Sequence, residues 1–126
     1  MNLVQVAQHA DDLDRAQDFY SRLLGTEPVA RFEPPGLLFF GLGDVRLLLD
    51  RAAPSALLYL AVENLAGRVE QLRADGVTVE TEPHKIFRHD DNRLGPQGTD
   101  EWQAFIRDSE GNLVGLVEQV TRSDED

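Results

Sequence analysis

Three side chains in this sequence could serve acid–base chemistry. His9 ends an apolar stretch, Tyr59 lies inside a second one, and His84 follows Pro83 in a polar segment. Imidazole and phenol groups commonly transfer protons in enzymes, so His9, Tyr59 and His84 are our catalytic candidates. Taken singly, each histidine also has a structural explanation, because His9 could cap a strand end and His84 could pack on a loop.

A metal site is an alternative use of the same residues. If Gln5 points inward, strand alternation places Gln5, Ala7 and His9 on one face. His84 follows Pro83 at the start of a long loop and could reach the same cavity, so Gln5, His9 and His84 form a candidate ligand set for Zn, Mn, Ni or Fe, with Gln5 and His84 as the predicted ligands. Glu118 is a weaker candidate, since it should face the other way on a regular strand. The absence of any cofactor is equally open, with Gln5 a buried core amide.

The segment RHDDNR (88–93) groups one histidine with two aspartates. Consecutive residues seldom converge on one ion, and no calcium-loop spacing is present. We therefore expect His89, Asp90 and Asp91 to lie in a solvated loop. That loop is predicted over residues 82–100 and could act as a lid over a cavity.

Composition and charge exclude several partners. The chain of 126 residues has a net charge of −11 and no cysteine. Nucleic acid demands a basic surface, and without cysteine there are no disulfides or thiolate zinc sites. The N-terminus lacks the pattern of an export signal, and no apolar run approaches the roughly 18 residues of a membrane span. We expect a cytoplasmic protein whose partners include neither nucleic acid nor a membrane.

The elements that must position the candidates begin with a strand and a helix. Residues 3–9 are compatible with a strand. The stretch DDLDRAQDFYSRLLG predicts a helix that Asp11 or Asp12 caps and Gly25 ends. Three short strands are predicted to follow, over residues 28–32, 36–41 and 44–50.

The same order then restarts. A strand is predicted over 56–62, and then a helix over 63–76 that Asn64 caps. Further strands are predicted over 77–81, 101–108 and 112–120. Superimposing the helix starts pairs Asp12 with Asn64, an offset of 64 − 12 = 52. We predict a single α+β domain over residues 1–120, built of two β-α-β-β-β modules, residues 1–52 and 53–120, with a disordered acidic tail at 121–126.

These phrases carry a family resemblance. The openings VQVAQHADDLDRAQDFYSRLLG and LLYLAVENLAGRVEQLRADGV, with the closing RDSEGNLVGLVE, resemble the vicinal oxygen chelate superfamily. That superfamily includes glyoxalase I, extradiol dioxygenases and the fosfomycin and bleomycin resistance proteins. The resemblance covers roughly residues 3–118, and the FY..LLG phrase with the D..GN turn is its most specific part. It implies a glyoxalase-like half-open barrel around a ligand cavity, and a homodimer.

The resemblance also implies where a metal would bind. Metal-dependent members take ligands from four strand positions, which correspond here to Gln5, Leu47, Leu57 and Gly115. A divalent cation needs several oxygen or nitrogen donors, and only Gln5 offers one. The usual metal site is therefore expected to be degenerate. Gly115 would leave room either for a ligand or for a neighbour's side chain.

Three functions stay open at this point. The first is a glyoxalase-like enzyme, a lyase or dioxygenase-like protein that acts on a small organic molecule. The second is a metal-independent protein of the bleomycin-resistance kind, which sequesters its ligand unchanged. The third is a scaffold with a vestigial cavity. For the first two, the predicted ligand-binding residues line an apolar cleft: Gln5, Leu47, Leu57, Trp102, Gly115 and Val117.

Overall fold

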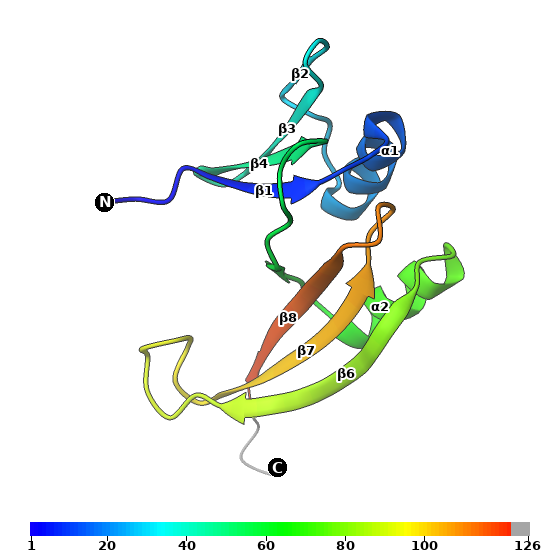
Figure 1. The fold of residues 1–126 in the computed structure, drawn as a ribbon. Helices are drawn as coiled ribbons and strands as arrows, with labels where there is room; N and C mark the ends of the chain where they lie inside the picture. Colours follow the sequence, from blue (N-terminus) through cyan, green and yellow to red (C-terminus); the bar gives the residue numbers. More distant parts are fainter. Residues whose placement is uncertain (122–126) are drawn as a thin grey trace. The chain divides into compact units, whose positions relative to one another are not determined.

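A computed structural model describes residues 1–121 and divides the chain into two compact units (Figure 1). The first unit comprises Met1–Leu57 together with Asp108–Asn112, and the second comprises Leu58–Arg107 and the chain from Leu113 onward. Each unit contains one four-stranded sheet and one helix of the described chain. The predicted α+β fold of two β-α-β-β-β modules is confirmed. The predicted tail beyond Thr121 lies outside the described residues.

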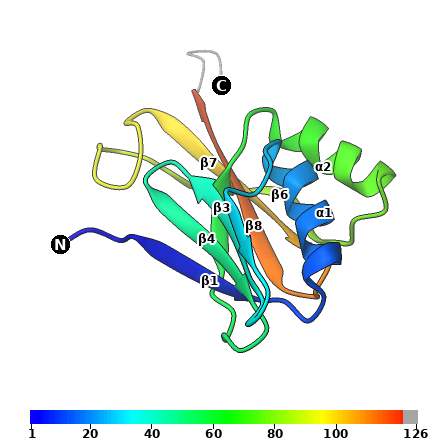
Figure 2. The same cartoon turned by 90° about the horizontal axis from the view of Figure 1, so that it is seen from above.

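The first unit follows the predicted order of elements. It contains β1 (Gln5–His9), α1 (Leu13–Leu24), β2 (Ala30–Phe32), β3 (Leu37–Leu42) and β4 (Val45–Asp50). The strands are ordered β1-β4-β3-β2, and β1 runs parallel to β4. A parallel pair needs a crossover connection, which α1 and the two short strands supply. Figure 2 shows α1 beside this sheet.

The core of the first unit lies between α1 and one face of its sheet. The side chains of Leu13, Ala16 and Tyr20 on α1 are buried. Alternate residues of β3 and β4 are buried with them, namely Leu38, Phe40, Leu47 and Leu49. Burial therefore follows the helical period along α1 and a two-residue period along the strands.

The ends of α1 are those predicted from the sequence. Asp12 has extended backbone, and its carboxylate accepts a hydrogen bond from the amide of Arg15 at 3.0 Å. Gly25 ends the helix with φ +71°, and its amide donates to the carbonyl of Ser21. A side chain at Gly25 would be strained in this left-handed conformation.

The second unit repeats the plan. It contains β5 (Leu58–Ala61), α2 (Leu65–Ala74), β6 (Val79–Arg88), β7 (Thr99–Arg107) and β8 (Leu113–Thr121), with strands ordered β5-β8-β7-β6. Asn64 caps α2 as predicted, through a 3.3 Å bond from the amide of Gly67. Glu118 of β8 adds a second cap, since its two oxygens accept from the amides of Asn64 and Leu65 at 2.8 and 3.0 Å.

The predicted loop over residues 82–100 is wrong at both ends, where its residues belong to strands. β6 continues from Val79 to Arg88, so the connection to β7 spans only residues 89–98. The strand was hidden because β6 is an edge strand, most of its side chains are exposed, and Pro83 interrupts its pattern. Three register shifts against β7 mark bulges, which bend the strand visibly in Figure 1.

The turn Asp108–Asn112 belongs to the first unit, where it closes a buried polar network. The hydroxyl of Tyr20 donates to Asp108 Oδ2 at 2.6 Å, and the other carboxylate oxygen accepts from the amides of Glu110 and Asn112. The Asn112 side chain donates to the carbonyl of His9 at 2.8 Å. Burial raises the pKa of Tyr20, and the Asp108 carboxylate raises it further. The two most specific phrases of the sequence are therefore hydrogen-bonded to each other.

Candidate functional site

The second sheet has one face covered by α2 and one face turned away from it. Along β7 and β8 the even-numbered residues Ala104, Ile106, Val114 and Leu116 are buried on the covered side, where Glu118 also caps α2. The odd-numbered residues form the other side, which we call the open face. Its side chains meet in rows across the strands: Thr81, Phe105, Gly115 and Tyr59; His84, Gln103, Val117 and Ala61; Phe87, Glu101 and Gln119.

A buried carboxylate lies on this open face. Glu101 is only 9% exposed, and three side chains donate hydrogen bonds to it or stand within bonding distance. His89 Nε2 lies 2.9 Å from Oε1, Gln103 donates to Oε2 at 2.8 Å, and Gln119 donates to Oε1 at 3.4 Å. A buried charge is costly unless it is hydrogen-bonded in this way, so the neighbours of Glu101 hold it in its ionised form.

Burial and hydrogen bonding act on the pKa of Glu101 in opposite directions. Burial acts to raise it, but the hydrogen bonds from Gln103, His89 and Gln119 outweigh burial and lower the pKa below its ordinary value. Hydrogen bonding to the charged form favours that form. Glu101 therefore behaves as a fixed negative charge near neutral pH, and it is a poor proton acceptor.

His89 is held in place by the connection between β6 and β7. Its amide donates to the carbonyl of Thr99 at 2.8 Å, and its carbonyl accepts from Gly98 at 2.9 Å. The ring packs 4.7 Å, centroid to centroid, from Phe87. The backbone at Gly95 passes so close to the His89 ring that a Cβ there would lie 2.7 Å from the imidazole. Only a glycine allows the chain to pass over the ring.

A hollow of about 420 Å³ opens beside Glu101 on the open face. Tyr59 forms an aromatic part of its wall, and its side chain is 53% exposed overall. The full lining comes from β5, β7 and β8: Tyr59, Ala61, Glu101, Gln103, Val117 and Gln119. The hollow thus combines one charged acceptor, two amides and an apolar wall, which is the usual make-up of a small-molecule site.

Gly115 makes room for neighbouring side chains. A Cβ at this position would lie 2.8 Å from Tyr59 Cδ1 and 3.0 Å from Phe105 Cε1. The two rings meet edge to face, with centroids 5.8 Å apart. Of the two explanations that the sequence left open, the structure shows the second, in which a neighbour fills the space.

The predicted catalytic residues lie in both units. Tyr59 and His84 face the open side of the second sheet, where His84 pairs with Gln103 in register and its Nδ1 lies 3.0 Å from the carbonyl of Glu82. His9 ends β1 in the first unit. Its Nε2 lies 2.7 Å from Asp11 Oδ1, which raises the pKa of the imidazole. A catalytic role for the three remains a prediction.

Of the four positions that the resemblance predicts for a metal site, only Gln5 has a side chain with a donor atom. The amide oxygen of Gln5 accepts a 3.0 Å bond from Arg46 Nε, so a guanidinium occupies its neighbourhood. Leu47 is fully buried on the α1 side of its sheet. Alternation along β4 thus places its side chain on the opposite face from Arg46 and Gln5, and the prediction that it lines the cleft with Gln5 is wrong. Leu57 is 45% exposed ahead of β5. Among residues 1–121, no three His, Cys, Asp or Glu side chains are grouped to hold a metal.

Two further candidates fall on different faces of the second sheet. Val117 faces the open side and lines the hollow beside Glu101. Trp102 pairs with Glu118 across β7 and β8 and lies on the α2-covered side, so it cannot line the same surface. Glu118 faces away from the side of Gly115, as strand alternation predicted.

Sequence reasoning missed Glu101, and its prediction that His89 lies in a solvated loop is wrong, because the His89 side chain is only 2% exposed. The signal for Glu101 was present, because in the predicted strand 101–108 Trp102, Ala104 and Ile106 make one apolar face. The opposite face then consists of Glu101, Gln103 and Phe105. His89 carried no such signal, since its burial depends on a glycine six residues later in the chain.

Comparisons with known proteins agree with this architecture. The Glyoxalase/Bleomycin resistance protein/Dioxygenase superfamily model matches residues 2–116. The chain therefore belongs to this superfamily. A comparison with curated protein sequences gives no match. None of the described helices is long and apolar enough to cross a membrane.

Solved structures share the fold over nearly the whole chain. A superfamily member from Sphaerobacter thermophilus has a TM-score of 0.71 at 18% identity, covering 94% of this chain and 97% of its own. The lactoylglutathione lyase from Agrobacterium tumefaciens has 0.64 at 25% identity, with 93% and 92% covered. An integron cassette protein of V. cholerae has 0.69 at 19% identity, with 94% of both chains covered.

Proposed function

We propose that this protein binds a small organic molecule on the open face of its second sheet, without a metal at the family's positions. The observation that carries the proposal is the buried Glu101 carboxylate, which borders a hollow of about 420 Å³. A carboxylate offers about four acceptor sites. His89, Gln103 and Gln119 account for three, which leaves capacity for one donor from a ligand.

The hollow also indicates the kind of ligand. A hydroxyl or amine group would donate to Glu101, and an apolar ring would pack against Tyr59 and Val117, which line the same hollow. Amide groups of Gln103 and Gln119 would orient further polar atoms. The ligand we propose is therefore a small ring compound that carries a hydrogen-bond donor.

Binding fits this geometry better than acid–base catalysis. The lowered pKa of Glu101 makes it a weak base, whereas a general base works best with a pKa near the operating pH. His89 has a side chain only 2% exposed and is turned to Glu101, so its imidazole does not reach the hollow. We therefore favour the sequestering function over an enzymatic one.

A fragment screen by amide NMR tests the proposal. Ring compounds bearing a hydroxyl or amine should shift the resonances of Tyr59, Val117 and Gln119, and the recovered fragments should be chemically unchanged. Benzyl alcohol and toluene form a matched pair with and without the donor. Equal binding of the two, or fragments that never shift the open face, would overturn the proposal, and conversion of a fragment would point to an enzyme.

A further inference from the structure

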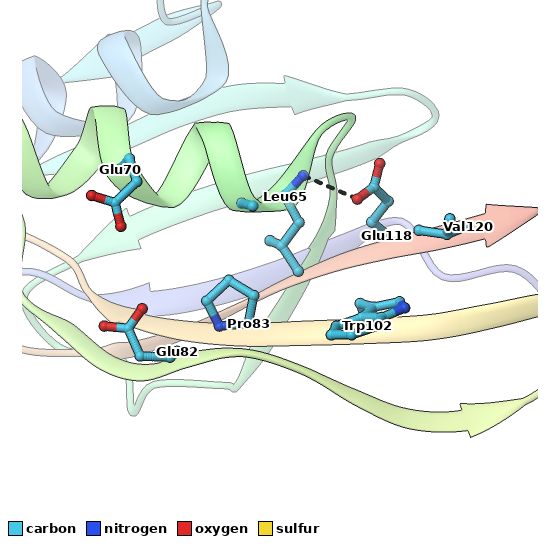
Figure 3. Close-up of a pocket in the computed structure, with 8 residues that line it drawn as sticks. Leu65, Glu70, Glu82, Pro83, Trp102, Glu118 and Val120 are labelled. Carbon is cyan, nitrogen blue, oxygen red and sulfur yellow. Dashed lines mark hydrogen bonds between the residues drawn. The ribbon is translucent and has the colours of Figure 1, made fainter. Parts of the chain in front are cut away.

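A second cavity lies on the opposite side of the same sheet, under α2. It has a volume of about 540 Å³ and is lined by residues of α2, β6, β7 and β8: Leu65, Ala66, Glu70, Glu82, Pro83, Trp102, Glu118 and Val120. We call it the helix-side pocket (Figure 3). The pocket is partly open to solvent, so a small molecule can enter it.

The walls of the helix-side pocket are apolar in the middle and acidic at the ends. In Figure 3 the side chain of Leu65 points down from α2 toward Pro83 and Trp102 on the strands below. Glu70 and Glu82 lie together toward one end of the view, and Glu118 lies toward the other. A ligand here would meet a flat aromatic surface and carboxylates together.

Local strand geometry explains how Pro83 and Glu82 come to line this pocket. β6 pairs Thr81 with Phe105 and His84 with Gln103, so three steps on β6 match two on β7. Such a bulge leaves extra residues unpaired and re-aims their side chains. The bulge therefore turns Glu82 and Pro83 toward α2.

The pocket has an excess of negative charge. Three of its lining residues are acidic and none is basic. Arg73 outside the lining pairs with Glu82, and its Nη2 also lies 3.5 Å from Glu70, so one cation serves two carboxylates. The Glu118 carboxylate faces the amides that begin α2. The two carboxylates at this end thus outnumber the guanidinium that pairs with them.

We propose that the helix-side pocket binds a small organic cation, such as an amine or quaternary ammonium group attached to an apolar chain. The cationic head would lie at the end of the pocket where Glu70 and Glu82 supply the balancing charge, and the chain would extend toward the indole ring of Trp102 near the other end. The apolar chain would contact Leu65 and Pro83. This ligand differs from the donor-bearing ring compound proposed for the open face, and the two sites lie on opposite faces of one sheet.

The tryptophan itself reports on binding. The sequence has a single tryptophan, so the emission of Trp102 can be followed without interference. We would titrate the protein with hexyltrimethylammonium, hexan-1-ol and hexanoate, which share a chain length and differ in charge. The cation should change the emission at the lowest concentration, the alcohol at a higher one, and the anion at the highest.

Two charge-neutralising variants localise the effect. Glu70→Gln removes one carboxylate of the pocket at an exposed helix position, and should weaken hexyltrimethylammonium binding about two- to fivefold while leaving hexan-1-ol unchanged. Glu63→Gln is the matched control, because Glu63 is exposed and outside the lining. Thermal melts would check that both variants fold.

Several results would overturn the inference. Trp102 emission that does not respond to the cation would show that the pocket takes no such ligand. Equal affinity for the cation and hexan-1-ol would show that only apolar contact matters. An equal loss in Glu63→Gln and Glu70→Gln would reduce the effect to overall charge. Failure here leaves the open face untouched, since that site is followed by the resonances of Tyr59 and Val117.

Discussion

The two units of this protein use one folding pattern and differ in what they place on the side of the sheet away from the helix. In the first unit, Arg46 is exposed there, bonded to Gln5, with its guanidinium 5.9 Å from the ring centre of Phe39. In the second unit, Glu101 is buried there among donors from other side chains. A cation on the first face can stay solvated, whereas the anion on the second must be supported by the fold.

Two buried carboxylates, Glu110 and Glu101, are held by different kinds of donor. Glu110 of the first unit has a side chain with no exposed surface, and it accepts from the Arg15 guanidinium and from the amide of Asp12. Its oxygens are used to fasten a turn to the start of α1. Glu101 is held by side chains alone and borders a hollow. Because its donors come from the start of α1, we assign Glu110 a structural role.

Among the variants proposed here, Glu110→Gln is expected to lower the stability of the fold the most. The variant loses a charge-assisted pair with Arg15 and should lower the free energy of unfolding by about 2 kcal/mol at neutral pH. Urea denaturation measures it. If Glu101→Gln destabilised the chain more than Glu110→Gln did, the distinction between the two carboxylates would fail.

The pairing of Glu110 with Arg15 also makes the stability of the fold depend on pH. Burial acts to raise the pKa of Glu110, but hydrogen bonds from Arg15, the Asp12 amide and Ser109 lower it from 4.5 to about 2. A lowered pKa contributes stability that is fully present above the unfolded value and is lost as pH falls toward the folded value. The difference in unfolding free energy between the wild type and Glu110→Gln should therefore become smaller as the pH falls from 4.5 to 2.

A smaller effect is expected at Gly115. The added methyl of Gly115→Ala would meet Tyr59 at 2.8 Å and Phe105 at 3.0 Å, so a ring must move, at a cost of about 1–2 kcal/mol. Gly41→Ala on β3 is the matched control, because there the nearest atom to a Cβ is 3.8 Å away. Thermal melts of both variants make the comparison. Equal melts would mean that the rings do not need the space.

The smallest effect concerns His9. Its bond to Asp11 raises the pKa of His9 above 6.5, so the stabilisation is present at low pH and is lost as pH rises through the folded pKa. Asp11→Asn should bring the pKa of His9 down, which a proton NMR titration of the imidazole would show. An unchanged pKa would remove Asp11 as its cause.

Much of the fold follows from the sequence because helix caps and turn residues are local signals. Asp12, Gly25 and Asn64 mark helix ends by chemistry that needs no tertiary context. β6 escaped because an exposed edge strand with Pro83 carries no burial pattern. Leu47 was predicted to line the cleft but is buried toward α1, because strand faces reverse with an error of one residue.

The candidate site was less predictable than the fold. Family positions pointed to Gln5, Leu57 and Gly115, where this chain has few donor atoms. The charged group of the site comes instead from Glu101, and its support from His89 at the start of a loop. Contacts that depend on loop closure, such as Gly95 passing over His89, leave no local trace in the sequence.

The role of Glu101 in ligand binding is tested by the affinity of wild type and Glu101→Gln for the tightest open-face fragment, measured by NMR titration. Glu63→Gln serves as the charge control, and Tyr59→Ala is a second variant at a half-exposed ring. We expect Glu101→Gln to weaken binding about tenfold or more, Tyr59→Ala to weaken it less, and Glu63→Gln to leave it unchanged. Unchanged affinity in both Glu101→Gln and Tyr59→Ala would contradict the assignment of the open face as the binding site.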